Sequence, residues 1–183
     1  MLRRALLLAS VVLLLIAKAS SGQAPSGYAA ETGRELKALS AAEIQGYLEG
    51  KGMGFAKSAE LNGYPGPLHV LEHAEDLGLT AEQRRATEEL FRTMQRNAKA
   101  LGAELIAQER ELERLFAGQT ATVEAMRPVL RKIGSLQAEL RSAHLEAHLA
   151  QTKVLTPEQI ARYGELRGYA ASDPHAGHTG HHP

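Results

Sequence analysis

Two long amphipathic segments separated by a short turn constrain this chain more than any other feature. Residues 81–117 contain no proline and no cluster of turn-forming residues, and their apolar side chains recur at helical spacing. Residues 118–121 form a turn, and Thr122 is placed to cap a second long helix that runs to about residue 152. Helices of this length joined by so few residues must fold back as an antiparallel hairpin.

Short helices are expected on both sides of this hairpin. A capping box at Ser40 predicts a helix that runs to about residue 49. Further short helices are expected over about 53–61 and 67–77, and a last one from Pro157 to about residue 168. Because no segment has the alternation of a strand, the fold class is all-α: a long antiparallel helical hairpin with short flanking helices. The hairpin cannot bury its apolar stripes alone, so the short helices or a second subunit must complete the core.

The N-terminus has the pattern of a secretory signal peptide. Two arginines precede an apolar run over residues 5–17, and small residues follow at the positions that a signal peptidase reads. The run is shorter than the roughly 20 residues that a membrane-spanning helix needs. We expect cleavage after residue 19, export to the periplasm and no stable membrane span after cleavage. An uncleaved N-terminal anchor is the alternative.

Differences in composition divide the rest of the chain into three regions. Residues 20–39 show no period and are expected to be a flexible leader, residues 40–169 are expected to form the helical domain, and residues 170–183 are expected to be a disordered histidine-rich tail. The chain has no cysteine, which excludes disulfides and thiolate metal sites. Its formal net charge is zero and aromatic residues make up only 4%, so we expect no nucleic-acid partner.

The histidines are the main candidates for metal ligands in this chain. His69 and His73 are four residues apart, as are His144 and His148, so each pair shares one helical face. Such pairs suit zinc, nickel, cobalt or copper. The alternative is that these are core histidines satisfied by hydrogen bonds.

The hairpin register suggests where the two pairs meet. With the turn near residue 119, His148 lies opposite Phe91 and within about a turn of two carboxylates, Glu88 and Glu89. We therefore predict a metal site at this end of the hairpin. Its candidate ligands are His69, His73, His144 and His148 with Glu88 or Glu89, and the tail histidines His175, His178, His181 and His182 are candidates for low-affinity metal collection.

The string His-Val-Leu-Glu-His at residues 69–73 also has the order found in inverted zinc peptidases, with Glu72 as the general base. Those enzymes are larger α/β proteins, whereas this chain has neither a sheet nor a deep substrate cleft. We expect that the chain is not an enzyme.

Two copies of an L-T-x-x-Q motif, each ahead of a helix, bracket the hairpin. They are Leu79, Thr80 and Gln83 in the first copy, and Leu155, Thr156 and Gln159 in the second. In each copy we expect a capping box, in which the threonine caps the helix and the glutamine returns the hydrogen bond, with the leucine packed beside them. A twice-used motif in an exported helical chain resembles the Spy/CpxP family of bacterial periplasmic proteins. The resemblance covers residues 40–169, and it is strongest to the heavy-metal sensor and zinc-resistance branch.

This resemblance implies a hairpin that dimerises into a curved cradle. It also implies either ATP-independent chaperone activity or a role in envelope stress and metal resistance. His69, His73 and His144 match the ligand order of the nickel and cobalt sensors, whereas His148 stands where such sensors carry a methionine. The ligand glutamate of those sensors corresponds only approximately to Glu88 or Glu89.

Together these features predict a periplasmic homodimer that binds a divalent transition metal for sensing, buffering or resistance, with an envelope signalling partner. The alternative is an ATP-independent chaperone of unfolded clients that has no structural metal site.

Overall fold

The computed structural model describes residues 26–169. The chain divides into two units, and the boundary along the sequence lies between Gly33 and Arg34. The described part of the first unit contains one short 3-10 helix, η1 (Ala29–Glu31). The signal-peptide prediction for residues 1–19 and the tail prediction for residues 170–183 lie outside the described residues.

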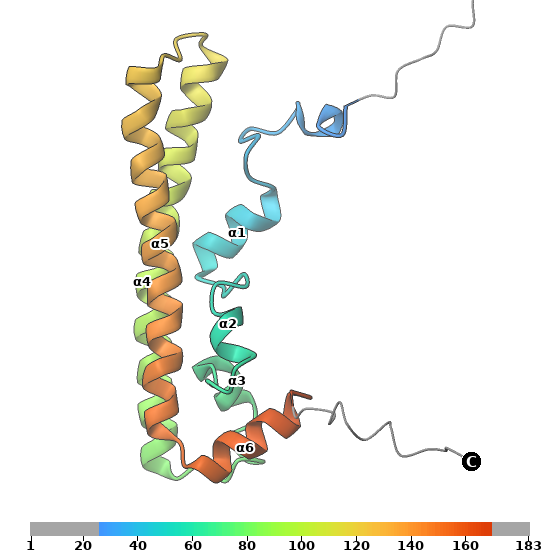
Figure 1. The fold of residues 1–183 in the computed structure, drawn as a ribbon, viewed down its shortest axis with the longest axis vertical. Helices are drawn as coiled ribbons and strands as arrows, with labels where there is room; N and C mark the ends of the chain where they lie inside the picture. Colours follow the sequence, from blue (N-terminus) through green and yellow to red (C-terminus); the bar gives the residue numbers. More distant parts are fainter. Residues whose placement is uncertain (1–25, 170–183) are drawn as a thin grey trace, which may run out of the picture. The chain divides into compact units, whose positions relative to one another are not determined.

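The second unit is built on the predicted hairpin. Helices α4 (Ala81–Ala117) and α5 (Val123–Val154) pack antiparallel over most of their length (Figure 1). Thr80 and Thr122 cap them, each accepting a hydrogen bond from the backbone N–H three residues on. All regular structure within residues 26–169 is helical, which confirms the predicted fold class.

The short helices line one side of this hairpin. Helices α1 (Ala41–Glu49), α2 (Lys57–Glu60) and α3 (Pro67–Glu72) follow one another along it, with α1 and α3 packed on α4 and α2 on α5 (Figure 1). Helix α6 (Pro157–Leu166) follows α5 at the end that we call the base of the hairpin.

Two of the short helices are shorter than the sequence indicates. Helix α2 begins only at Lys57, because Met53 and Gly54 take positive φ angles of 42° and 80°, which no α-helix accommodates. Helix α3 ends at Glu72 rather than near residue 77. His73 leaves helical geometry there, and the chain continues in turns to Gly78, which has a φ of 60°.

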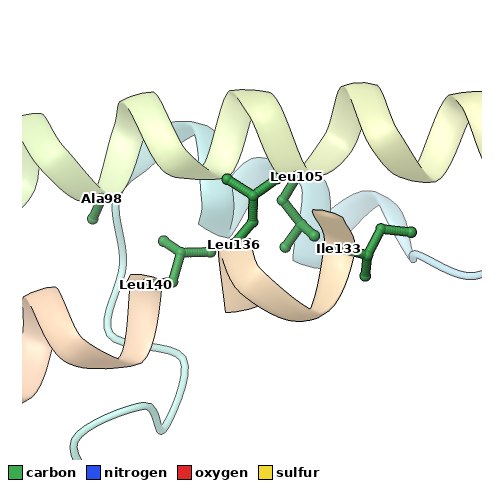
Figure 2. Packing of buried hydrophobic residues seen from close by; sticks show 5 residues of the cluster. All are labelled: Ala98, Leu105, Ile133, Leu136 and Leu140. Atoms are coloured by element: carbon green, nitrogen blue, oxygen red, sulfur yellow. The ribbon is translucent and has the colours of Figure 1, made fainter. Parts of the chain in front are cut away.

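An apolar cluster occupies the middle of the hairpin. Ala98 and Leu105 of α4 pack against three side chains of α5, Ile133, Leu136 and Leu140 (Figure 2). Leu136 is fully buried. Tyr47 and Phe55, which come from α1 and from the segment before α2, cover the cluster.

The packed domain begins before Ser40. Leu36 and Leu39 belong to the segment expected to be a flexible leader, yet both are buried against Ile106 of α4. Two leucines three residues apart are too short a pattern to reveal a period.

Gly102 explains how α1 approaches α4 so closely. A Cβ at this position would lie 2.6 Å from the Tyr47 carbonyl oxygen, so only glycine fits where the two backbones meet. Within residues 26–169, no helix combines the length and the hydropathy that crossing a membrane requires.

Candidate functional site

The two L-T-x-x-Q motifs meet at the base of the hairpin. Gln83 donates to the side-chain oxygen of Gln159 at 2.8 Å, and Gln159 donates back to that of Gln83 at 3.1 Å. Each glutamine oxygen also accepts from the backbone N–H of its own capping threonine, Thr80 or Thr156. The capping boxes predicted from the sequence are thus present, and the structure adds that the two copies bind one another.

The remaining contacts of this glutamine pair attach neighbouring segments. Gln83 donates to the Val154 carbonyl at the end of α5, and Gln159 donates to the Leu77 carbonyl in the turns after α3. The motif leucines Leu79 and Leu155 pack in one apolar cluster with Val70, Leu77 and Tyr163. The paired motifs therefore hold α3 and α6 against the end of the hairpin. We call this arrangement the glutamine clasp.

A cavity of about 190 Å³ is lined by residues of α3, α4 and α5 and receives histidines from two of these helices. His69 of α3 and both His144 and His148 of α5 line it, together with Phe91 of α4. Three of the four histidines that were predicted as ligands on helices therefore line one cavity. Phe91, which the predicted register set opposite His148, lines it as well.

His144 is the most buried of the three. It is 3% exposed, and its ring stacks on Phe55 with the centroids 5.6 Å apart. Its Nε2 is buried without a hydrogen-bond partner in the structure. Burial, helped by the nearby His148, lowers the pKa of this imidazole below its usual value. The ring is therefore neutral at pH 7 and keeps a lone pair.

His148 is held by backbone on one side. Its Nδ1 lies 2.8 Å from the Tyr64 carbonyl oxygen, which accepts only, so Nδ1 carries a proton and, in the neutral form of the ring, Nε2 has the lone pair. The backbone of Gly66 packs closely against this side of the ring. A Cβ on Gly66 would come within 2.9 Å of Nε2, so any larger residue would press on the ring.

The first histidine pair is divided between two environments. The His69 Nδ1 lies 2.7 Å from a carboxylate oxygen of Glu72. His73 follows the last residue of α3, and its Nδ1 faces Asp76 at 3.6 Å. The structure brings His69 to the cavity and leaves His73 outside its lining.

The expected carboxylates point elsewhere. Glu89 bonds to Arg92 and Thr93, and Glu88 lies 3.8 Å from Arg92, so neither joins the cavity lining. A carboxylate that the sequence did not indicate lies beside His148 instead: Oε2 of Glu60, on α2, is 3.6 Å from the His148 Nδ1. No sequence pattern marked Glu60, because it belongs to a four-residue helix distant from His148 in the chain.

The cavity holds donors of the right kind for a metal, but they are not gathered around one point. Within residues 26–169, no three His, Asp or Glu side chains are arranged to hold a metal ion as they stand. The unpartnered buried Nε2 of His144 is nevertheless a feature that a ligand would satisfy. The four tail histidines lie beyond the described part of the chain.

A second, larger hollow lies along the hairpin itself. It measures about 620 Å³, and all of its lining residues belong to α4 and α5. Leu90, Met94 and Leu101 form its apolar side on α4, facing alanines of α5, while Glu139 and Glu146 stand among its polar members. We call it the hairpin groove.

A helical hairpin whose base is closed by paired L-T-x-x-Q segments defines a distinct class of all-α protein. The family model described as "LTXXQ motif family protein" matches residues 69–167, more than half of the chain, and the chain belongs to this family. Its members are typically periplasmic or extracellular. No curated protein and no solved structure gives a significant match to this chain.

Proposed function

We propose that this chain is a periplasmic protein that binds a divalent transition metal, namely zinc, nickel, cobalt or copper, for sensing, buffering or resistance. His69, His144 and His148 are the proposed ligands. The observation that carries the proposal is the buried Nε2 of His144, which has no partner and belongs to a cavity that two further imidazoles line. A buried polar atom without a partner is rare and calls for an explanation.

The hydrogen bonds behind the histidines also support metal binding. Ligand imidazoles in metalloproteins usually donate their second ring N–H to a carboxylate or a backbone carbonyl, which fixes the tautomer. The Nδ1 of His69 faces Glu72 in this way, and the Nδ1 of His148 faces the Tyr64 carbonyl. In both rings Nε2 remains available as the ligand atom.

Binding requires a small rearrangement at His69. The side chain of His69 is 35% exposed, whereas that of His148 is 12% exposed and that of His144 is packed on Phe55. The two α5 histidines would thus form the fixed part of the site, and His69 the part that closes. A bound divalent ion would supply the positive charge that draws three neutral imidazoles together.

The central experiment is a calorimetric titration of the exported chain with each of the four metals. His175, His178, His181 and His182 are first replaced by Ala, so that the tail does not obscure the helical site. We expect at least one dissociation constant below about 10 μM, corresponding to roughly 7 kcal/mol. Weaker binding for all four metals would overturn the proposal.

Single histidine variants identify the ligands. His144→Ala or His148→Ala should weaken binding at least tenfold, since loss of even an outer partner of a ligand costs about 10–100-fold. His73→Ala is the matched control, because His73 faces Asp76 outside the cavity lining. If His73→Ala weakened metal binding equally, the ligand set implied by the family resemblance, which includes His73, would be favoured over the set that lines the cavity. Circular dichroism of each variant checks that the helices remain.

A glycine pair tests the site without removing a ligand. Gly66→Ala places a methyl group against the His148 ring and should weaken metal binding while all histidines remain. Gly134→Ala is the control, since a Cβ at Gly134 meets nothing within 4 Å. Equal metal affinity in both variants would show that the close fit of Gly66 against His148 does not matter for the site.

A chaperone without a structural metal site is the second candidate, and the hairpin groove favours it. An apolar hollow of about 620 Å³ confined to the two long helices is a surface on which an unfolded client could dock. Suppression of client aggregation that is unchanged by chelator and lost in Leu101→Glu would support this function. Suppression that needs metal would favour the first.

The remaining parts of the proposal follow from the sequence. The chain is proposed to be exported by its N-terminal segment, to form a homodimer, to work with an envelope signalling partner or unfolded clients, and to have no enzymatic activity. The tail histidines would collect metal at low affinity. Light scattering of the purified protein measures the oligomeric state, and N-terminal sequencing of the mature protein identifies the cleavage site.

A further inference from the structure

Glu60 is a buried carboxylate at the junction of three segments. Its side chain is 12% exposed, although it lies on a four-residue helix at the surface of the hairpin. Tyr163 of α6 donates to its Oε1 at 2.5 Å, and the Arg167 Nε lies 3.5 Å from the same oxygen. Its Oε2 has no hydrogen bond in the structure and lies 3.6 Å from the His148 Nδ1.

The two carboxylate oxygens therefore face opposite ways. Oε1 is bound to the C-terminal helix, and Oε2 is directed toward the imidazole side chain. The Nδ1 proton of His148 has the Tyr64 carbonyl as its primary acceptor and Glu60 as a second, charged neighbour. A carboxylate in this position makes the opposite nitrogen of an imidazole a stronger metal ligand.

Tyr163 is suited to hold Glu60 in place. Burial, followed by the contact with Glu60, raises the pKa of the Tyr163 hydroxyl far above its usual value, so the hydroxyl keeps its proton and donates. Helix α6 is itself attached at its start by Gln159 of the glutamine clasp. A continuous set of contacts thus runs from the motif, through α6 and Glu60, to His148.

We propose that Glu60, held by Tyr163 and Arg167, is a positioning residue for His148, and that the docking of α6 thereby sets the affinity of the histidine cavity for a divalent metal. This inference rests on the proposed metal-binding function. It assigns to the C-terminal helix a regulatory role toward a site that α6 does not itself line. Any partner that moved α6 would change metal affinity, and metal would in turn favour the docked helix.

The first test measures metal affinity in the full exported chain with its tail histidines replaced. Glu60→Gln keeps the shape of the side chain and its bond to Tyr163 but removes the charge, and it should weaken binding about 10–100-fold. Tyr163→Phe should weaken binding by a smaller factor. Glu165→Gln on the exposed face of α6 is the matched control and should leave affinity unchanged.

The second test separates positioning from a merely structural role. Hydrogen exchange of the amides in residues 157–166 is followed with and without the metal that binds best. In the wild type, metal should slow their exchange, because coupling between two sites is reciprocal. In Glu60→Gln and Tyr163→Phe, metal should no longer slow it, even at concentrations that saturate the site.

The outcomes distinguish the two proposals. Absence of metal binding in the wild type would overturn the proposed function and this inference with it. Tight binding that is lost in His144→Ala but unchanged in both Glu60→Gln and Tyr163→Phe would overturn only the role of Glu60. Wild-type binding that leaves exchange in α6 unaltered would also overturn it. If Glu60→Gln loses helix content, the milder Tyr163→Phe decides.

Discussion

The middle and the base of the hairpin are built from the same two helices but are stabilised in different ways. In the middle, aliphatic side chains such as Leu105, Leu136 and Leu140 interdigitate between α4 and α5 (Figure 2). At the base, buried polar side chains share the interior with an apolar cluster. They form the glutamine clasp, the Gln151 to Thr87 hydrogen bond and the contact of Glu60 with Tyr163.

The two kinds of contact have different consequences for the fold. Apolar contacts stabilise a fold without demanding one particular arrangement, whereas buried hydrogen bonds are satisfied only by one. The polar contacts at the base therefore fix how α3 and α6 pack against the hairpin. Helix α3 in turn carries His69, one of the residues that line the histidine cavity. In the middle, apolar side chains of the two long helices pack directly against one another.

The largest expected effect is in the middle of the hairpin. Leu136→Ala removes a fully buried side chain and should lower the free energy of unfolding by about 2–5 kcal/mol. Leu130→Ala, on the same helix but 44% exposed, is the matched control and should change it by less than about 0.5 kcal/mol. Urea denaturation measures both. Equal effects would mean that the middle is not the stabilising region.

A smaller effect is expected at the base. Gln159→Ala leaves the Leu77 carbonyl and the Thr156 N–H without their side-chain partner and removes both hydrogen bonds to Gln83, which should cost about 1–3 kcal/mol. Gln137→Ala on the exposed face of α5 is the control, with a change within about 0.5 kcal/mol. The clasp variant should also speed amide exchange in α3 and α6 while the middle of α4 stays protected. Uniform loss of protection would contradict a separate role for the base.

The smallest effect is a pH dependence of opposite sign in the two regions. In the middle, burial raises the pKa of Glu109, so the folded state binds its proton more tightly than the unfolded state. Its contribution to stability is full below the usual pKa of about 4.5 and is lost as the pH rises through the raised value. Glu109→Gln should therefore stabilise the protein at pH 7 and not at pH 4.

At the base, burial lowers the pKa of His144, so the unfolded state binds that proton more tightly. Its contribution is full above the usual value of about 6.5 and is lost as the pH falls toward the lowered one. In His144→Gln, the part of the decrease in stability between pH 7 and pH 5 that comes from this histidine should be absent. Thermal unfolding at fixed ionic strength follows both variants. The same sign of pH dependence in both would contradict the assignment.

Local signals in the sequence located most of the helices. Capping boxes at Ser40, Thr80 and Thr156 were predicted from residue types alone, and all three are present. The bounds of α4 were predicted correctly, because Thr80 and Gly118 mark both of its ends. The predicted end of α3 near residue 77 was wrong, since no residue type marks Glu72 as its last position.

The candidate site was only partly accessible from the sequence. The position of the turn was enough to place His148 opposite Phe91, and the structure puts both residues in the cavity lining together with His144. The carboxylate was not found in this way. Glu60 reaches His148 only because α2 packs against α5, and that contact depends on turns whose conformation local residue preferences do not specify.

By itself the sequence determined the all-α class, the long hairpin, the capped helix starts and the presence of two histidine pairs, because each depends on residues within one or two helical turns of one another. Only the tertiary structure decided which polar groups meet. It paired Gln83 with Gln159, brought His69 to His144 and His148 while leaving His73 aside, and put Glu60 between α6 and His148. Polar groups that lie on different helices meet only when those helices pack together, and the packing depends on the side chains at each contact and not on any one segment.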